Sequence, residues 1–146
     1  MSSLLEFFEV VAAEWRARRV PLLPPVAEPE LAKLFADLGC PLSADVRDLY
    51  TTVGGFADGA EDEMWTLWSP RLIRDENESE HRPFVMFADY LLGSHVYCFR
   101  YETAERSSVY ISYDGRSLER EAIATSVAEF FEKLLCSPGE VDAWRI

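Results

Sequence analysis

Apolar residues recur at the spacing of an α-helix in four segments, residues 3–19, 29–39, 43–53 and 126–135. An apolar residue at every third or fourth position places one stripe of side chains on one face of a helix. Ser-x-x-Glu capping boxes open the first and the last segment, and Pro29 suits a first helical position in the second. We therefore expect four amphipathic helices, each with one face for the core.

The third of these segments has the most distinctive ending, LSADVRDLYTTVGGFAD over residues 42–58. Ser43 is expected to cap the helix through its hydroxyl group. Gly54 and Gly55 are expected to end it, because glycine adopts positive φ angles without a Cβ clash. An acidic loop, residues 56–63, follows directly.

The middle of the chain changes to short segments rich in β-branched and aromatic residues. Gly93-Ser94 and Asp114-Gly115 are turn signals between neighbouring segments and predict hairpins. The polar segment 71–82 has no steady period, so it is expected to be an exposed loop or a short helix. The expected strands are residues 64–68, 84–92, 96–101, 109–113 and 118–123. This order predicts an α+β fold: N-terminal helices, a central, mostly antiparallel sheet and a C-terminal helix packed on it.

A chain of 146 residues, 49% of them hydrophobic, is expected to form one domain over residues 1–146 with its own core. No apolar run reaches the ~20 residues that cross a bilayer. The N-terminus carries acidic residues where a signal peptide has basic ones. We therefore expect a soluble cytoplasmic protein, with Trp144 and Ile146 in the tail free to dock on the core or on a partner.

The formal net charge of −12 limits the kinds of partner that the chain is expected to bind. Such a chain repels nucleic acid and anionic membranes and attracts basic partners. Residues 58–89 hold nine acidic residues and three arginines, a net charge of −6. Acidity that serves solubility alone is the plainer interpretation, but its concentration in this segment favours a docking surface.

Motifs for catalysis or cofactor binding are absent from the sequence. The two histidines, His81 and His95, have no Cys, Ser or carboxylate at a recognisable catalytic spacing, and no phosphate-binding glycine loop is present. The run from Glu61 to Glu63 could bind a hard cation, but consecutive side chains diverge. We expect no enzyme activity, no metal and no cofactor. Three cysteines without a CxxC spacing are expected to be reduced and buried, namely Cys40, Cys98 and Cys136.

Trp65 and Trp68 lie on opposite faces of the 64–68 strand if it is regular. One interpretation places one of them in the core and leaves the other exposed beside the acidic loop, where it would anchor a basic partner. The alternative is that both pack in the interior.

Taken together, these segments resemble the SMI1/KNR4 (SUKH) superfamily. The resemblance is carried by the helix ending in Gly-Gly-Phe, the tryptophan strand, FVMFADYLL, VYCFRY, the 109–113 strand and the helix SVAEFFEKLL. It runs from Leu42 to Leu135. The family typically has Leu-Pro before the helix and Asn before Gly-Gly, where this chain has Pro41-Leu42 and Val53.

The resemblance implies a protein-binding function. Bacterial members of the superfamily are immunity proteins that bind and block toxins, many of them nucleases, whereas fungal members are regulatory scaffolds. We therefore expect an immunity protein for a cognate, basic toxin, with a regulatory or scaffold module as the alternative. The residues expected to contact the partner are Asp58, Glu61, Asp62, Glu63, Trp65, Trp68, Asp75, Glu76, Glu78 and Glu80.

Overall fold

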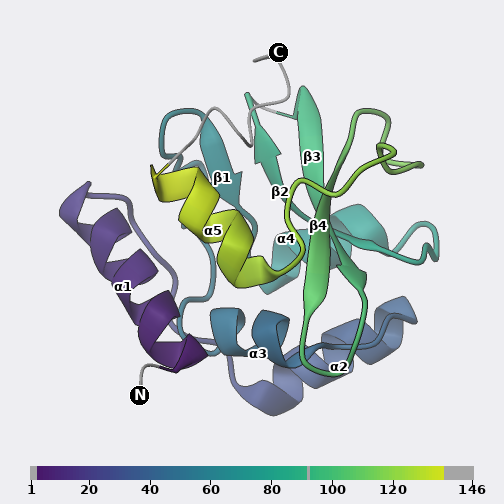
Figure 1. Ribbon diagram of the computed structural model, residues 1–146, viewed down its shortest axis with the longest axis horizontal. Coiled ribbons are helices and arrows are strands. Elements are labelled where there is room, and N and C mark those ends of the chain that lie inside the picture. The colour runs from purple at the N-terminus through teal and green to yellow at the C-terminus, as the bar shows by residue number, and fades with distance from the viewer. Residues whose placement is uncertain (1–2, 92, 137–146) are drawn as a thin grey trace.

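The computed structural model describes residues 3–91 and 93–136, which form five helices and one four-stranded sheet (Figure 1). The helices are α1 (Leu4–Ala17), α2 (Glu28–Leu38), α3 (Ala44–Tyr50), α4 (Pro70–Asn77) and α5 (Val127–Cys136). The strands are β1 (Trp65–Leu67), β2 (Val85–Tyr90), β3 (His95–Tyr101) and β4 (Ser107–Ser112). The predicted α+β class is confirmed.

The sheet is a simple antiparallel meander in the order β1-β2-β3-β4. Tyr90 pairs with His95 at the β2–β3 turn, where the Gly93-Ser94 signal predicted a hairpin. The pairing of β2 with β3 is irregular between Met86 and Ala88. The register shifts there, as it does at a β-bulge, where one strand has an extra residue. A bulge bends the strand and redirects its side chains.

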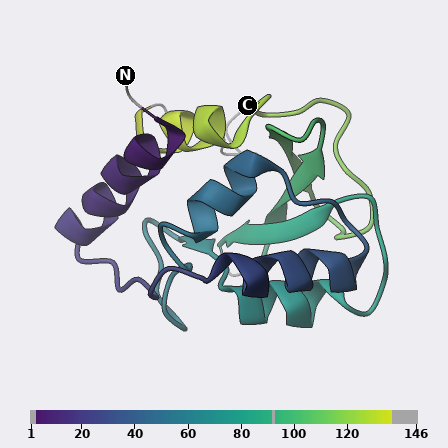
Figure 2. The same cartoon turned by 90° about the horizontal axis from the view of Figure 1, so that it is seen from below.

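Helices cover the two faces of the sheet unequally (Figures 1 and 2). On one face α5 packs on β4 and on α1, and Trp65 lies within 6.1 Å of Trp15 and 6.0 Å of Phe130, ring centroid to ring centroid. On the other face α4 contacts β2, with α2 beside it. Since α4 is short, that second face is only partly covered.

The Gly54-Gly55 pair has a different role from the one predicted. Helix α3 already ends at Tyr50, and just beyond it the Thr51 and Thr52 hydroxyls donate to the carbonyls of Arg47 and Asp48. The glycines instead let other backbone segments approach. A Cβ on Gly54 would lie 2.1 Å from the carbonyl oxygen of Pro24. Gly55 has a φ of +104°, and a Cβ there would lie 2.8 Å from the Cα of Ser69.

Ser43 precedes α3, but its hydroxyl does not cap that helix. It donates to the Asp45 carboxylate at 2.6 Å and lies 2.7 Å from the Ser107 hydroxyl. The predicted cap is therefore wrong: a buried carboxylate two residues later competes for the same hydroxyl.

The predicted return strand over residues 118–123 is also wrong. The Asp114 carboxylate accepts from the backbone N–H groups of Arg116 and Ser117, which opens the expected tight turn into a wider one. The chain then touches β4 only at single points, such as the bridge from Val109 to Ala124. Segment 71–82 resolves into α4 and a loop, while Trp144 and Ile146 lie outside the described residues. Within the described chain, no helix has the length and apolarity to cross a membrane.

Candidate functional site

The eight acidic residues predicted to face a partner fall into two groups. The first is the acidic loop, residues 56–63, between Gly55 and β1. The second, the α4 group, lies at the C-terminal end of α4 and just beyond it. Seven of the eight are exposed, and only Asp62 is partly buried. The α4 group consists of Asp75, Glu76, Glu78 and Glu80.

The acidic loop is held by hydrogen bonds at its end. Asp62 and Trp65 exchange both backbone hydrogen bonds, at 2.9 Å each, around a two-residue turn formed by Glu63 and Met64. The Asp62 carboxylate accepts from Arg18 of the α1 C-terminus at 2.7 Å. This ion pair occupies Asp62, whereas Glu61 and Glu63 form no ion pair with any residue in the described part of the chain.

Neither tryptophan of β1 and its extension is an exposed anchor. Trp65 is 3% exposed in the aromatic core, and Trp68 is 4% exposed. The Trp68 indole N–H donates to the Asp89 carboxylate at 2.6 Å. The interpretation with both tryptophans packed is confirmed by this burial. Their contact with a partner stays a prediction.

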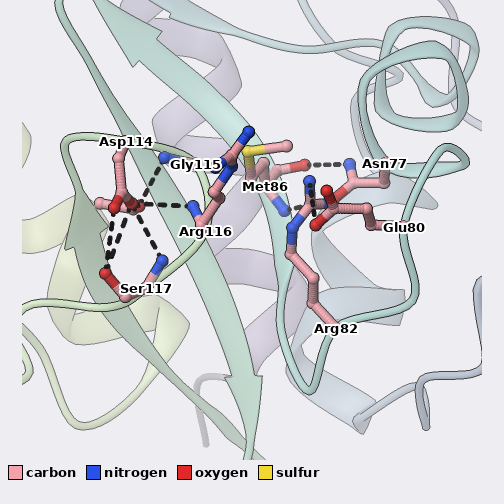
Figure 3. Close-up of polar contacts among 9 residues, drawn as sticks. Asn77, Glu80, Arg82, Met86, Asp114, Gly115, Arg116 and Ser117 are labelled. Atoms are coloured by element: carbon pink, nitrogen blue, oxygen red, sulfur yellow. Dashed lines mark hydrogen bonds and ion pairs between the residues drawn. The ribbon is translucent and has the colours of Figure 1, made fainter.

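Trp68 nevertheless lines a cleft of about 650 Å³ on the α4 side of the sheet. Glu76 and Glu80 of the α4 group form one wall of this cleft, and the turn after β4 forms the other. Met86 and Val96 lie between them (Figure 3 shows Met86).

The α4 wall is fixed to the sheet by one side chain. The Asn77 amide donates to the carbonyl oxygens of Ile73 and Met86, at 2.7 and 2.9 Å, and accepts from the Met86 N–H at 2.9 Å. Asn77 is 3% exposed. Since buried amide groups with all these bonds are costly to rearrange, the end of α4 is held firmly over β2.

The opposite wall is built on Asp114. Its Oδ1 accepts from the N–H groups of Arg116 and Ser117 at 2.8 and 3.0 Å (Figure 3). These backbone bonds lower the pKa of the Asp114 carboxyl to about 2. The turn thereby presents Arg116 at the cleft, where its side chain forms no ion pair with a residue that the structure describes.

Arg82 is the unusual residue of this cleft. Its side chain is only 12% exposed, and its Nε and Nη1 atoms are buried with no hydrogen-bond partner among residues 3–91 and 93–136. Its Nη2 lies 3.4 Å from Oε2 of the half-exposed Glu80. A charge-assisted N–H···O bond is typically about 2.7–2.9 Å long, so this contact is loose. Leaving a buried donor unsatisfied costs about 1–3 kcal/mol, and more for a charged group.

Histidines and cysteines form no reactive group here. His95 is buried with its Nε2 3.1 Å from the Tyr97 hydroxyl, and the exposed His81 lies beside Gly39. Burial raises the pKa of the Cys40 and Cys98 thiols, which disfavours the nucleophilic thiolate. Cys136 is exposed, so its predicted burial is wrong. Among the described side chains, no three His, Cys, Asp or Glu groups are placed to hold a metal ion.

The sequence pattern pointed to Trp68, Glu76 and Glu80 of this cleft but missed its arginines and its second wall. Arg82 counted only as one positive charge in an acidic segment, and Asp114-Gly115 only as a hairpin signal. The cleft joins segments that are far apart in the chain, which periodicity does not register. An arginine at the end of an otherwise acidic run, next to a proline, was the available signal for Arg82.

Comparison with known proteins gives one match. The chain fits the model of the SMI1 / KNR4 family (SUKH-1) over residues 25–133, well over half of its length. That range includes all the residues of the acidic loop, the α4 group and the cleft. No curated protein matches the chain.

Proposed function

The chain belongs to the SMI1/KNR4 family, and from this premise we propose that it is a cytoplasmic immunity protein that binds and neutralises a cognate bacterial toxin. The proposed target is a basic domain of nuclease type. Family membership supports a protein-binding role in general. The negative net charge of this chain supports a partner with a positively charged surface.

The observation that carries the proposal is the exposure of acidic side chains with free hydrogen-bonding capacity. Asp58, Glu61 and Glu63 of the acidic loop, with Glu76 and Glu78 of the α4 group, are exposed and form no ion pair with a described residue. A surface of this kind accelerates encounter with a basic protein and repels nucleic acid. It also competes for the cationic groups with which a nuclease holds its substrate.

The decisive experiment is co-expression with the protein encoded beside it. We expect that neighbouring product to stop growth when expressed alone, and growth to recover when this chain is co-expressed. Purified from such cells, the two proteins should migrate as one complex. Charge reversal of Glu76 and Glu78 to lysine should weaken rescue, while Glu119→Lys with Glu121→Lys, the same charge change beside β4, should leave rescue intact.

A neighbour that is not toxic, or a toxic neighbour that this chain neither binds nor neutralises, would contradict the proposal. A complex with a harmless neighbour would instead favour the regulatory or scaffold role, since it retains binding without toxin neutralisation.

A further inference from the structure

The cleft next to α4 combines a surplus of hydrogen-bond donors with an apolar floor. Two guanidinium nitrogens of Arg82 are buried without an acceptor among the described residues, and its third nitrogen has a loose contact with Glu80. Arg116 reaches the same cleft from the facing wall (Figure 3). The two arginines lie on either side of Met86.

The carboxylates around the cleft do not cancel these donors. Asp89 accepts from the Trp68 indole, and Asp114 accepts from the backbone of its own turn. Both are therefore occupied. Glu76 is exposed on α4, and Glu80 is the one carboxylate among the described residues that forms an ion pair with Arg82, at a distance too long for a strong bond.

We propose that this cleft binds a carboxylate carried on an apolar or aromatic group. The carboxylate would replace Glu80 as the partner of Arg82, and Arg116 would approach it from the other wall. The apolar part would lie on Met86 and Val96. Planar guanidinium groups suit a carboxylate because they offer two parallel N–H bonds.

A free amino acid and the C-terminal end of a peptide share this chemistry. They differ at the amino group: the ammonium of a free amino acid would be attracted to Glu76, whereas the uncharged amide nitrogen of a peptide end would not. This proposal can be tested separately from toxin binding, because the titration uses the isolated protein and small molecules. Its failure would therefore leave the proposed function untouched.

The experiment is an NMR titration of the ¹⁵N-labelled full chain with N-acetyl-L-phenylalanine, L-phenylalanine and N-acetyl-L-phenylalaninamide. We expect the two acids to shift the Arg82 Nε–H and Trp68 indole signals in a saturable way, and the amide, which lacks the charge, to leave them in place. Tighter binding of L-phenylalanine would assign the site to a free amino acid, and tighter binding of its acetyl derivative to a chain end; either supports the carboxylate site. Equal shifts with the amide, or no shift with any of the three, would overturn it.

Two variants should move the affinity in opposite directions. Glu80→Gln removes the competing charge and should tighten binding of N-acetyl-L-phenylalanine, which has no ammonium group, several-fold. Glu76→Gln, also on the α4 wall but without an ion pair to Arg82, should change this affinity less. Arg82→Met should weaken binding about tenfold or more, the effect of losing charge-assisted bonds.

Thermal unfolding separates a ligand-binding role of Arg82 from a purely structural one. Because Arg82→Met replaces an unsatisfied buried charge by an apolar chain of similar length, its midpoint should equal or exceed that of the wild type. A marked fall in the midpoint, or weaker acid binding in Glu80→Gln, would show that the arginine serves the fold and not a ligand.

Discussion

Asp114 shows how one carboxylate shapes a whole wall of the cleft. It accepts from the backbone N–H groups of Arg116 and Ser117, with further contacts to the Ser112 and Ser117 hydroxyls at 3.3 to 3.4 Å. These bonds stabilise the ionised carboxylate of Asp114, which explains its low pKa of about 2. The turn is therefore a pH-dependent element at acidic pH.

Asp114→Asn should reveal this dependence. In the unfolded chain an aspartate has a pKa of about 4. The lower pKa in the folded protein therefore stabilises the fold above pH 4, and this stabilisation is lost as the pH falls from 4 to 2. The wild type should be the more stable protein at pH 6, and the difference in free energy of unfolding should shrink towards pH 2. Urea unfolding at a series of pH values measures it. Ser117→Ala, which removes only long hydroxyl contacts, should follow the wild type; a difference independent of pH would contradict the assignment.

Residue roles of this kind were the part of the site that the sequence did not predict. Exposure of the acidic residues followed from their composition, and the sequence pattern predicted it well. Arg82 and Asp114 depend on what surrounds them in space: the first on burial beside Glu80, the second on the path of the backbone two residues later. Neither condition leaves a periodic trace in the chain.

Asp45 links three elements that are distant in sequence. It lies in α3, is 2% exposed and accepts from Ser107 N–H of β4 and from Val127 N–H at the start of α5. Burial raises the pKa of its carboxyl, while the hydrogen bonds from Ser43, Val127 and Ser107 oppose that rise. One side chain thus joins α3 to both the sheet edge and the C-terminal helix.

Removing this link should destabilise the fold. Asp45→Ala leaves the Ser107 and Val127 N–H groups buried without an acceptor, at about 1–3 kcal/mol each, so we expect a loss of roughly 3 kcal/mol in the free energy of unfolding. Urea unfolding followed by tryptophan fluorescence gives this value. Asp48→Ala on the same helix, whose carboxylate has only a 3.5 Å contact with Arg47, should cost less than about 1 kcal/mol. Equal losses in the two variants would show that helix propensity, and not the link, is responsible.

At the same scale, hydrophobic periodicity predicted α1, α2, α3, α5 and the first four strands, but it did not predict how some of them end, and it gave no steady signal for α4. It worked for α1, α2 and α5 because each buries one continuous stripe against the core. It failed after β4, where the Asp114 side chain accepts from the N–H groups of Arg116 and Ser117 and so widens the turn that was expected to lead into a return strand. Side-chain competition for backbone groups is local chemistry, and binary patterning does not record it.

For the molecule as a whole, the acidic loop precedes β1 in the chain and the α4 group follows it, so the two groups can be tested separately. The acidic loop is the simpler surface to test, because Glu61 and Glu63 are exposed and form no ion pair with a described residue, whereas Asp62 is held by Arg18. Reversing Asp62 would disturb α1 as well as the surface charge. Glu61 and Glu63 report on long-range attraction alone.

Glu61→Lys with Glu63→Lys should therefore slow association with the proposed toxin partner, by about tenfold at low ionic strength, and change the dissociation rate little. Attraction between exposed charges is screened over about 10 Å at 0.1 M salt, so the wild type and the variant should converge as salt is raised. Stopped-flow mixing over a salt series measures both rates.

Glu119→Lys with Glu121→Lys changes the net charge equally at the opposite edge of the sheet, and it should slow association less. If both double variants slow association alike, net charge and not the acidic loop guides the encounter; if the loss appears in dissociation and persists in high salt, the loop is a contact surface held in the bound complex.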